Sequence, residues 1–417
     1  MSDNLPPITI ETCDSGRREP GMMVFNVRPG AGGSGKTKGG WIIAVAQSGD
    51  IAFSLKLDAP TQDVRRHPNG NLVFSQTGIG LMTEIDPSGQ TLRQWHANGK
   101  WTDKNPPPGS IAIDAPFITH TINVLPNGNF LLLTAETRDY ENWPASETDP
   151  NAGTRTATLV GDVILEVTQA GTIAGRWHML DIFDPYRICY GSTRDYWDRH
   201  GFTNSNDWCH ANSIAYDPRD DTILVSLRTQ DCIAKIARGS GELRWILGTH
   251  ANWRAPWTEK LLHPVGNVEW AYHQHDASVT PSGTILCFDN GNHRATPFAP
   301  KQPAEENYSR IVEFEVDEAA RTVRQIWSYG EPPAPPLFGR FQGGAFRLPQ
   351  TGNTFATFGG LCTSNGIPVD EEVTGFCRAQ LLELTPDKQI VFDLRVDGSA
   401  TDESLSVFRA EHVPRRV

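Results

Sequence analysis

Short apolar runs separated by turn residues recur along the whole chain. Many runs are four to eight residues long and alternate apolar with polar positions, which is typical of half-buried β-strands. Pro, Asn, Asp and Gly form the turns between them, as in the stretch HTINVLPNGNFLLL that begins at His120. Few stretches have a helical period. The pattern therefore predicts an all-β protein.

A longer repeat groups these runs into units. Each unit ends with a Gly turn that leads to an aromatic residue, and this ending recurs six times at intervals of about 68 residues, at Phe53, Trp95, Trp177, Trp245, Trp327 and Phe392. Each unit has room for four short strands, so the spacing predicts a six-bladed β-propeller. The units exceed the roughly 40–45 residues of minimal blades. Long loop insertions between strands are therefore expected at 97–118, 138–160, 181–208, 249–272 and 294–308.

The two ends of the chain are predicted to close the ring in one blade. Residues 22–57 contain about three strands, and the segment LSVFRAEHV from Leu405 offers a fourth. Such pairing removes exposed strand edges. Residues 1–417 are therefore expected to form a single propeller domain. The alternative is a pair of unrelated β-sandwich domains, which the even spacing of the aromatic endings disfavours.

Composition and charge exclude several partners. The 417 residues carry a formal charge of −12, which argues against nucleic acid and against a polybasic membrane anchor. No stretch is apolar enough for a membrane helix, and the opening MSDNLPPITIE has no signal-peptide pattern. A cytoplasmic protein is therefore expected. Its seven scattered cysteines are expected to be reduced, although Cys362 and Cys377 bracket one loop and would pair under oxidising conditions.

One segment near the start imitates a nucleotide site. Residues 30–37 read GAGGSGKT, which matches the phosphate-binding loop pattern. That chemistry needs a helix after the loop. Here Gly39, Gly40 and an apolar strand pattern follow. We therefore interpret the segment as a glycine-rich loop between strands.

Three histidines occupy one position of the repeat. His120 and His275 lie six residues before a turn proline, and His210 lies eight before one; Gln62 and Gln342 take similar positions in two other units. Because the first strands of all blades line one central channel, these side chains are expected to form a polar ring. Histidine suits proton transfer near neutral pH and also metal binding. Sequence position alone does not choose between these roles.

Other polar and aromatic residues are expected near the ring. Asn212 lies two residues after His210, and the run FDNGNHR contains Asn290 and ends at Arg294. The planar guanidinium of Arg294 would suit a sulfate, phosphate or carboxylate, with a surface ion pair as the alternative. Tyr190 and Trp208 lie in an aromatic-rich insertion, which is either a lid for an aromatic substrate or a simple cover for one blade.

Several segments resemble those of bacterial arylsulfate sulfotransferases. They are the HTINVLPNGN segment from His120, HANSI from His210, QHDA around His275, FDNGN followed by Arg294, SRIVEF from Ser309, and TVRQIWSYG from Thr322. The resemblance is densest between about 119 and 360. It implies a six-bladed propeller that transfers sulfuryl groups between phenols without PAPS. It also implies sulfate-binding and acid–base roles for His210, His275 and Arg294.

The chain departs from this family at the nucleophile. In the family a histidine attacks the sulfur, but here no histidine occurs between His293 and His412, and Gln342 takes the corresponding position. An amide cannot accept a sulfuryl group as an imidazole does. A transferase would therefore use His275 or His120 instead, with no cofactor, on a small aromatic or anionic substrate that Asn212, Gln342, Tyr190, Trp208 and Asn290 help to bind.

Two other functions compete with this prediction. A metal-dependent lyase or hydrolase would bind a divalent ion (Zn, Mn or Ca) through His120, His210 and His275. A propeller that acts as a docking platform would instead present an apolar face. Nothing in the sequence indicates the oligomeric state.

Overall fold

The computed structural model describes residues 5–30, 39–370 and 375–415. In several repeats the first two strands are joined by a turn with the same backbone hydrogen bond. Gly70, Gly128 and Gly283 each have a positive φ and donate a backbone hydrogen bond three residues back, at 2.8 to 2.9 Å. Glycine adopts this conformation without steric cost, so the turn returns the chain antiparallel to itself. The phosphate-loop-like segment at residues 30–37 lies almost entirely outside the described residues.

The described residues form six mainly antiparallel sheets, with one α-helix, α1 (Met179–Ile182). This confirms the prediction of a nearly all-β protein. The first three sheets contain β2 (Met22–Pro29), β3 (Gly40–Ala46), β4 (Ile51–Leu57), β29 (Leu405–Ser406) and β30 (Ala410–Val413); β5 (Val64–Arg66), β6 (Leu72–Gln76), β7 (Leu81–Ile85), β8 (Thr91–Ala97) and β9 (Ile111–Ile113); and β10 (Thr119–Val124), β11 (Phe130–Pro144), β12 (Thr154–Val167), β13 (Ile173–His178) and β14 (Ser205–Asn206).

The other three sheets follow the same order along the chain. They contain β15 (Ala211–Asp217), β16 (Thr222–Leu227), β17 (Cys232–Ala237) and β18 (Leu243–Gly248); β19 (His263–Pro264), β20 (His275–Val279), β21 (Ile285–Asp289), β22 (Arg310–Asp317) and β23 (Thr322–Tyr329); and β24 (Gly344–Arg347), β25 (Thr354–Ser364), β26 (Ile367–Pro368), β27 (Phe376–Leu384), β28 (Ile390–Val396) and β1 (Ile8–Cys13).

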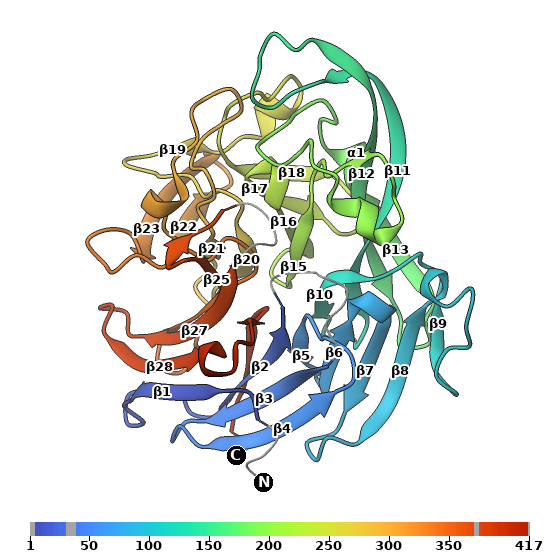
Figure 1. Cartoon of the computed structure of the whole chain (residues 1–417). Helices are drawn as coiled ribbons and strands as arrows, with labels where there is room; N and C mark the ends of the chain where they lie inside the picture. Colours follow the sequence, from blue (N-terminus) through green and yellow to red (C-terminus); the bar gives the residue numbers. More distant parts are fainter. Residues whose placement is uncertain (1–4, 31–38, 371–374, 416–417) are drawn as a thin grey trace.

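The sheets are arranged around the middle of the molecule (Figure 1). Their first strands contact one another in succession, β5 with β10, β10 with β15, β15 with β20, and β20 with β24. A separate cluster of buried apolar side chains packs each sheet against the next. One such cluster joins the first sheet to the sixth, with Phe25 and Phe355 among its members. Residues at the starts of the first strands are therefore brought together in the middle.

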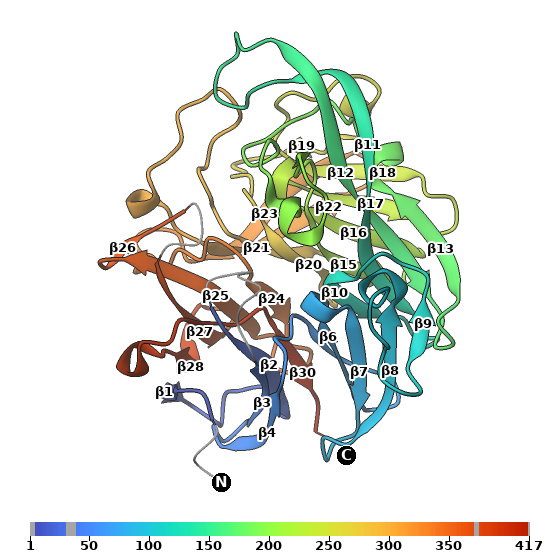
Figure 2. The ribbon, with the colours of Figure 1, turned by 45° about the vertical axis from the view of Figure 1, so that its right-hand side comes forward.

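The C-terminal segment lies against the first sheet. β30 pairs antiparallel with β2, from Met22 opposite Val413 to Phe25 opposite Ala410, and Figure 2 shows the two strands side by side. β1 instead joins the sixth sheet through β28, a pairing that the repeat pattern did not predict. One expected loop also differs, because β11 and β12 extend through most of residues 138–160 as a long hairpin.

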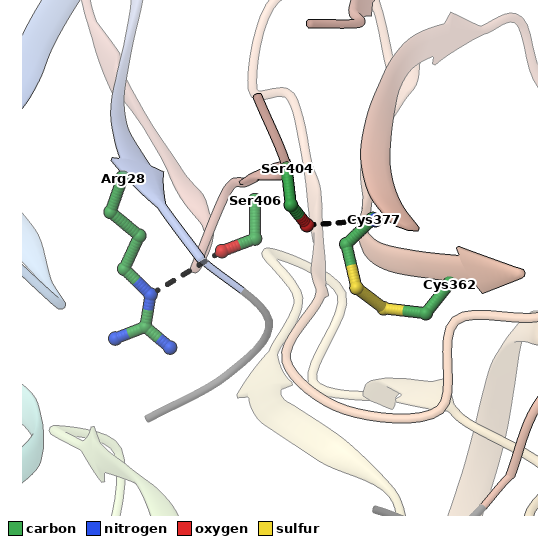
Figure 3. Close-up of a disulfide and its surroundings, with 5 residues drawn as sticks. All are labelled: Arg28, Cys362, Cys377, Ser404 and Ser406. Atoms are coloured by element: carbon green, nitrogen blue, oxygen red, sulfur yellow. Dashed lines mark hydrogen bonds between the residues drawn. A yellow bond between two sulfur atoms is a disulfide. The ribbon is translucent and has the colours of Figure 1, made fainter. Parts of the chain in front are cut away.

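Cys362 and Cys377 form a disulfide, so the expectation that every cysteine is reduced was wrong for this pair. The two residues stand directly opposite each other on β25 and β27, which brings their thiols within bonding distance. The Ser404 hydroxyl accepts a hydrogen bond from the Cys377 backbone N–H (Figure 3). Cys13, Cys189, Cys209, Cys232 and Cys287 are free.

Candidate active site

His120 and His210 form a buried pair. His120 lies on β10 and His210 immediately precedes β15, and their Nε2 atoms are 3.1 Å apart. Both backbones have a positive φ, 54° at His120 and 45° at His210. This conformation is uncommon for residues other than glycine and is often found at functional sites. It coincides with register shifts at the start of both strands.

The outer nitrogens of this pair also have partners. His210 Nδ1 lies 2.7 Å from Asp207 Oδ2, and His120 Nδ1 lies 2.8 Å from the Thr119 hydroxyl. The other Asp207 oxygen accepts a hydrogen bond from Trp197 Nε1 at 2.7 Å. Sequence reasoning missed Asp207, although its position three residues before His210 was a usable signal. A continuous chain of polar contacts therefore runs from Asp207 to Thr119.

His275 is held in one tautomer. Its Nδ1 faces two oxygens, Asn290 Oδ1 at 2.7 Å and the His273 carbonyl at 3.1 Å. The Asn290 amide nitrogen donates to the carbonyls of Gly339 and Gln342, so its oxygen is the atom that faces His275. Nδ1 therefore carries the proton, and Nε2 carries the lone pair.

Burial keeps the imidazoles of His120 and His275 neutral near neutral pH. It lowers the pKa of His120 well below 6.5, and the charges of neighbouring histidines, His210 and His275 among them, act in the same direction. Burial also lowers the pKa of His275 well below 6.5, and the positive charge of Arg228 adds to this effect. These mutual effects place the three predicted histidines within electrostatic reach of one another.

Arg228 is a cation beside these histidines, and sequence reasoning missed it. It follows β16 in a single 3-10 turn, and it is 6% exposed. Burial lowers the pKa of its guanidinium to about 10. Among the described residues, that guanidinium has no hydrogen bond or ion pair. Its positive charge lowers the pKa of His273 and of His275, so it lies within electrostatic reach of both.

Gln342 occupies the position where the nucleophile was expected. Its backbone carbonyl accepts a hydrogen bond from Asn290. With its amide oriented to satisfy both ends, Gln342 donates to the Val407 carbonyl at 3.1 Å and accepts from Arg28. Arg28 also donates to the Ser406 hydroxyl at 3.4 Å (Figure 3). The position expected for the nucleophile therefore holds the Gln342 amide, with the Arg28 guanidinium beside it.

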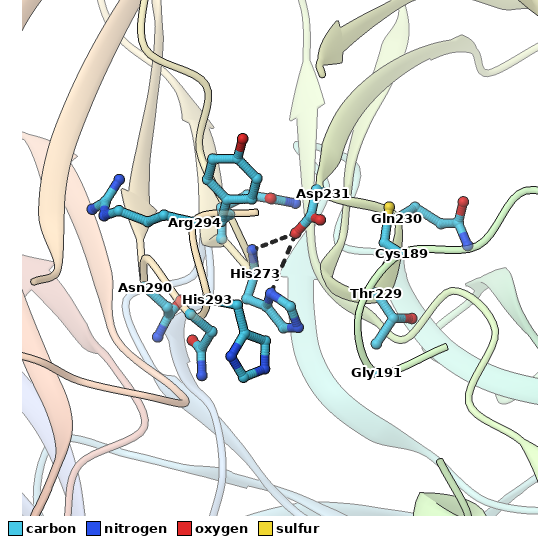
Figure 4. A network of polar contacts seen from close by, with 12 residues as sticks. Cys189, Gly191, Thr229, Gln230, Asp231, His273, Asn290, His293 and Arg294 are labelled. Carbon is cyan, nitrogen blue, oxygen red and sulfur yellow. Dashed lines mark hydrogen bonds and ion pairs between the residues drawn. The ribbon is translucent and has the colours of Figure 1, made fainter. Parts of the chain in front are cut away.

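Arg294 is not brought to the histidines by any contact among the described residues. Its guanidinium contacts Glu269 at 2.9 Å, Asp289 at 3.2 Å and the Tyr308 carbonyl at 2.7 Å. Figure 4 shows its side chain extending away from His273 and His293. The sulfate-binding role predicted from the motif therefore has no support from the position of this side chain.

Three remaining predicted substrate-binding residues, and Gln62 of the predicted polar ring, are buried in structural contacts. Asn212 donates to the Gln274 carbonyl, and Trp208, fully buried in the core between the third and fourth sheets, donates to the Arg187 carbonyl. The Tyr190 hydroxyl donates to the Ala299 carbonyl, and its ring lies 5.4 Å from that of His293. Gln62 accepts a hydrogen bond from the His120 backbone N–H. Of these four, Gln62 alone contacts the histidine pair directly.

A second polar layer lies beside the first. His273 donates its backbone N–H to Asp231 Oδ1 at 2.8 Å, and its Nδ1 lies 3.3 Å from the same oxygen (Figure 4). Burial raises the pKa of Asp231 to about 7 and lowers that of His273 well below 6.5. With a pKa of about 7, Asp231 is partly ionised near neutral pH, and its charge acts on Arg228 without a direct ion pair.

Metal-binding geometry was tested on the side chains that the structure describes. No group of three or more His, Cys, Asp or Glu among them is arranged to hold a metal ion.

Among the residues that the structure describes, no helix has the length and apolar character needed to span a membrane.

Both a protein-family model and individual known proteins match this chain in sequence. The arylsulfotransferase (ASST) family model matches residues 22–406. The chain belongs to the arylsulfotransferase family. It is 31% identical over 217 residues to arylsulfate sulfotransferase AssT from Escherichia coli O6:H1, a match that covers 42% of this chain and 35% of that protein. The namesake from Lelliottia amnigena is also 31% identical, over 215 residues. The match thus spans about a third of the length of these arylsulfotransferases.

Solved structures align along most of the chain but with low identity. A Bacteroides caccae protein of unknown function covers 94% of this chain and 98% of its own, with 14% identity and a TM-score of 0.49. The periplasmic gluconolactonase PpgL from Pseudomonas aeruginosa covers 94% of this chain and all of its own, with 13% identity and a TM-score of 0.42.

Proposed function

We propose that this arylsulfotransferase-family protein transfers the sulfuryl group of an aryl sulfate to a phenol. The site is formed by His120, His210, His275 and Arg228, named here the histidine–arginine cluster. The observation that supports it is the buried guanidinium of Arg228, which has no hydrogen bond or ion pair among the described residues and feels the charges of Asp207 and Asp231 only at longer range. A buried charge that makes no direct hydrogen bond or ion pair is costly. A sulfuryl group supplies negative oxygens that match the planar donors of arginine.

The proposed architecture follows from the six sheets. We propose that they are the blades of one six-bladed β-propeller made by residues 1–417 as a single domain. The contacts between successive first strands and the packing of the sixth sheet on the first favour this arrangement. The histidine–arginine cluster would then lie near the axis, where inner strands of different blades meet.

His275 is the proposed nucleophile in place of the missing family histidine. Its Nδ1–H is held by Asn290, and its neutral Nε2 carries an available lone pair. In the first step this lone pair forms an S–N bond, and the S–O bond to the aryl group breaks as its electron pair leaves with the aryl oxide. Asn290 Oδ1 stabilises the resulting imidazolium through the Nδ1 hydrogen bond.

The second step, followed by release of the acceptor's proton from the His120–His210 pair to solvent, returns the enzyme to its starting state. The acceptor phenol loses its proton to the His120–His210 pair, and its oxygen forms a bond to sulfur. The S–N bond breaks, and its electron pair returns to His275 Nε2. Arg228 faces the negative sulfuryl oxygens in both steps, so its charge favours both transition states.

We propose that this transfer requires neither a nucleotide nor a metal. The metal-dependent lyase or hydrolase reading needs ring nitrogens of His120, His210 and His275 as ligands. In the present arrangement Nδ1 of His210 and Nδ1 of His275 face oxygens, and the two Nε2 atoms of the pair face each other. Of these ring nitrogens, only Nε2 of His275 has no partner among the described side chains, so no observation favours the metal reading.

A chromogenic donor tests the proposed function. Purified protein is mixed with 4-nitrophenyl sulfate and phenol, with a chelator and without nucleotide. We expect nitrophenol release that depends on phenol, and formation of phenyl sulfate. His275→Ala should abolish both, whereas His263→Ala, an exposed histidine on β19, should retain them. No product from wild type at high enzyme concentration would contradict the proposal.

A further inference from the structure

Asp207 is held on both carboxylate oxygens. Oδ2 lies 2.7 Å from His210 Nδ1, and Oδ1 accepts the Trp197 indole N–H at 2.7 Å. Its backbone is also fixed, because its N–H donates to the Arg194 carbonyl and its carbonyl accepts from the Thr229 hydroxyl. The residue is 1% exposed. The carboxylate therefore has one orientation and faces one imidazole.

These contacts determine the tautomers of both histidines. An ionised carboxylate only accepts hydrogen bonds, so His210 Nδ1 must carry a proton. Nε2 of neutral His210 is then an acceptor, and His120 Nε2, 3.1 Å away, must be the donor. His120 Nδ1 is left as the acceptor of the Thr119 hydroxyl proton. The two Nε2 atoms therefore share one proton, and Asp207 accepts the other proton of His210, at Nδ1.

The pair has room for one additional proton. Two imidazolium rings at 3.1 Å would repel each other strongly, so both cannot be charged together. One added positive charge can move between the rings by shifting the shared proton. It is most stable on His210, next to the carboxylate. Asp207 thus gives the pair its capacity to accept a proton in a site that otherwise disfavours charged histidine.

We propose that Asp207 is the positioning residue that makes the His120–His210 pair a base for the acceptor phenol. This inference rests on the proposed sulfuryl transfer and assigns its second step. The phenol O–H bond breaks, and its proton goes to His120 Nδ1 in place of the Thr119 hydroxyl proton, while the proton between the rings shifts to His210 Nε2 and the phenol oxygen forms the O–S bond. The S–Nε2 bond of His275 breaks and returns its electrons to that nitrogen. The aryl oxide leaving in the first step needs no such base, so the two half-reactions should depend differently on Asp207.

Asp207→Asn tests this assignment with little change in volume. Asparagine has one side-chain acceptor where aspartate has two oxygens, so it cannot accept from both Trp197 and His210. Either it loses one hydrogen bond, or its amide N–H reverses the His210 tautomer. In both cases the pair loses the adjacent negative charge. Trp197→Phe removes only the other contact and leaves that charge in place.

The measurement separates the two half-reactions. A rapid-mixing burst of nitrophenol reports sulfuryl transfer to the protein, and steady-state product formation reports transfer to the acceptor. Two acceptors are compared at one pH, an un-ionised phenol and a phenol of low pKa that is already ionised. Asp207→Asn should leave the burst within about threefold and slow the un-ionised acceptor by about 100-fold, the usual scale of general-base catalysis. The ionised acceptor should lose less than about fivefold.

Two control variants and one replacement variant make the result decisive. Trp197→Phe and Asp217→Asn, a buried carboxylate at the far end of β15, should show no preference between acceptors. An equal loss with both acceptors in Asp207→Asn would overturn the inference and indicate a structural role. Failure of wild type with every donor and acceptor would instead contradict the proposed function. If Asp207→Asn does not fold, Asp207→Glu should still discriminate between the acceptors, and equal loss there would overturn the inference too.

Discussion

The Nδ1 atom of His275 lies 2.7 Å from Oδ1 of Asn290, whose amide nitrogen is itself fixed by two backbone carbonyls. This contact decides which nitrogen of His275 can attack sulfur. Asn290→Ala should lower the burst rate about 100-fold, because the freed imidazole can rotate or exchange tautomers. The lost hydrogen bonds should also cost about 1–3 kcal/mol of unfolding free energy.

The control for this variant is an asparagine with no such role. Asn151→Ala, in an exposed turn, should retain both burst rate and stability. Chemical denaturation with burst kinetics on the same samples separates the two effects. A variant that is destabilised yet keeps the full burst rate would show that Asn290 only supports the fold.

The position of Arg228 predicts a role in anion binding that the sequence motif assigns to Arg294. Arg228→Met should weaken competitive inhibition by inorganic sulfate and raise KM for the aryl sulfate by at least tenfold, since it removes the charge-assisted hydrogen bonds. Arg294 already contacts Glu269 and Asp289, so Arg294→Met should act mainly on stability. Steady-state kinetics and thermal unfolding of both variants check this, and the reverse pattern would favour the motif.

The low pKa of His275 predicts activity that persists in mild acid. Its protonation destroys the nucleophile, and both burial and the charge of Arg228 hold that pKa well below 6.5. The groups that act on it are Arg228, Arg409, His210 and Asn290. The burst rate should therefore stay constant as the pH falls from 8 through 6.5. Removing the Arg228 charge should raise the pKa and shift the loss of activity to higher pH; a wild-type midpoint at or above 6.5 would contradict this.

Buried Asp162 predicts a free energy of unfolding that falls as the pH rises. Burial raises the pKa of its carboxyl from 3.8 to about 7, so the folded state binds a proton between these values that the unfolded state has lost. Its contribution to stability is present below pH 4 and is lost as the pH rises through 7. Asp162→Asn keeps an acceptor for the Ala211 N–H and should not show this loss. Parallel denaturation curves of both proteins across this range would contradict the prediction.

The disulfide predicts a redox-dependent stability. Cys362 and Cys377 close a loop with a sequence separation of 15, for which loop-closure entropy gives about 3 kcal/mol. Cys362→Ser with Cys377→Ser should lower the unfolding free energy by about that amount and remove its response to reductant. Cys287→Ser, a buried free thiol, should leave the response intact. Intact mass under non-reducing conditions checks the bond itself.

The all-β fold could be predicted because period-two apolar runs and Pro–Asn–Gly turns carry local information. The Cys362–Cys377 disulfide was named only as the alternative to reduced thiols, because the separation of the two residues does not reveal that they face each other across β25 and β27. The shared position of His120, His210 and His275 in the repeat was readable, since equivalent first strands converge.

The partners of these histidines were harder to read. Asp207 lies outside the strands, and Arg228 lies in a single 3-10 turn, so no periodicity marks either as buried. Arg294 shows the reverse problem. Its motif indicated an anion site, but its contacts with Glu269 and Asp289 depend on loops that sequence does not place.

The central claim is that His275 carries the sulfuryl group between donor and acceptor. The most direct measurement is peptide mass spectrometry of protein that has been incubated with 4-nitrophenyl sulfate without acceptor and quenched in alkali. We predict one added SO₃ group on the peptide that contains His275, lost on addition of phenol and absent from His275→Ala. A stable adduct on another residue, or burst release without any adduct, would contradict the account.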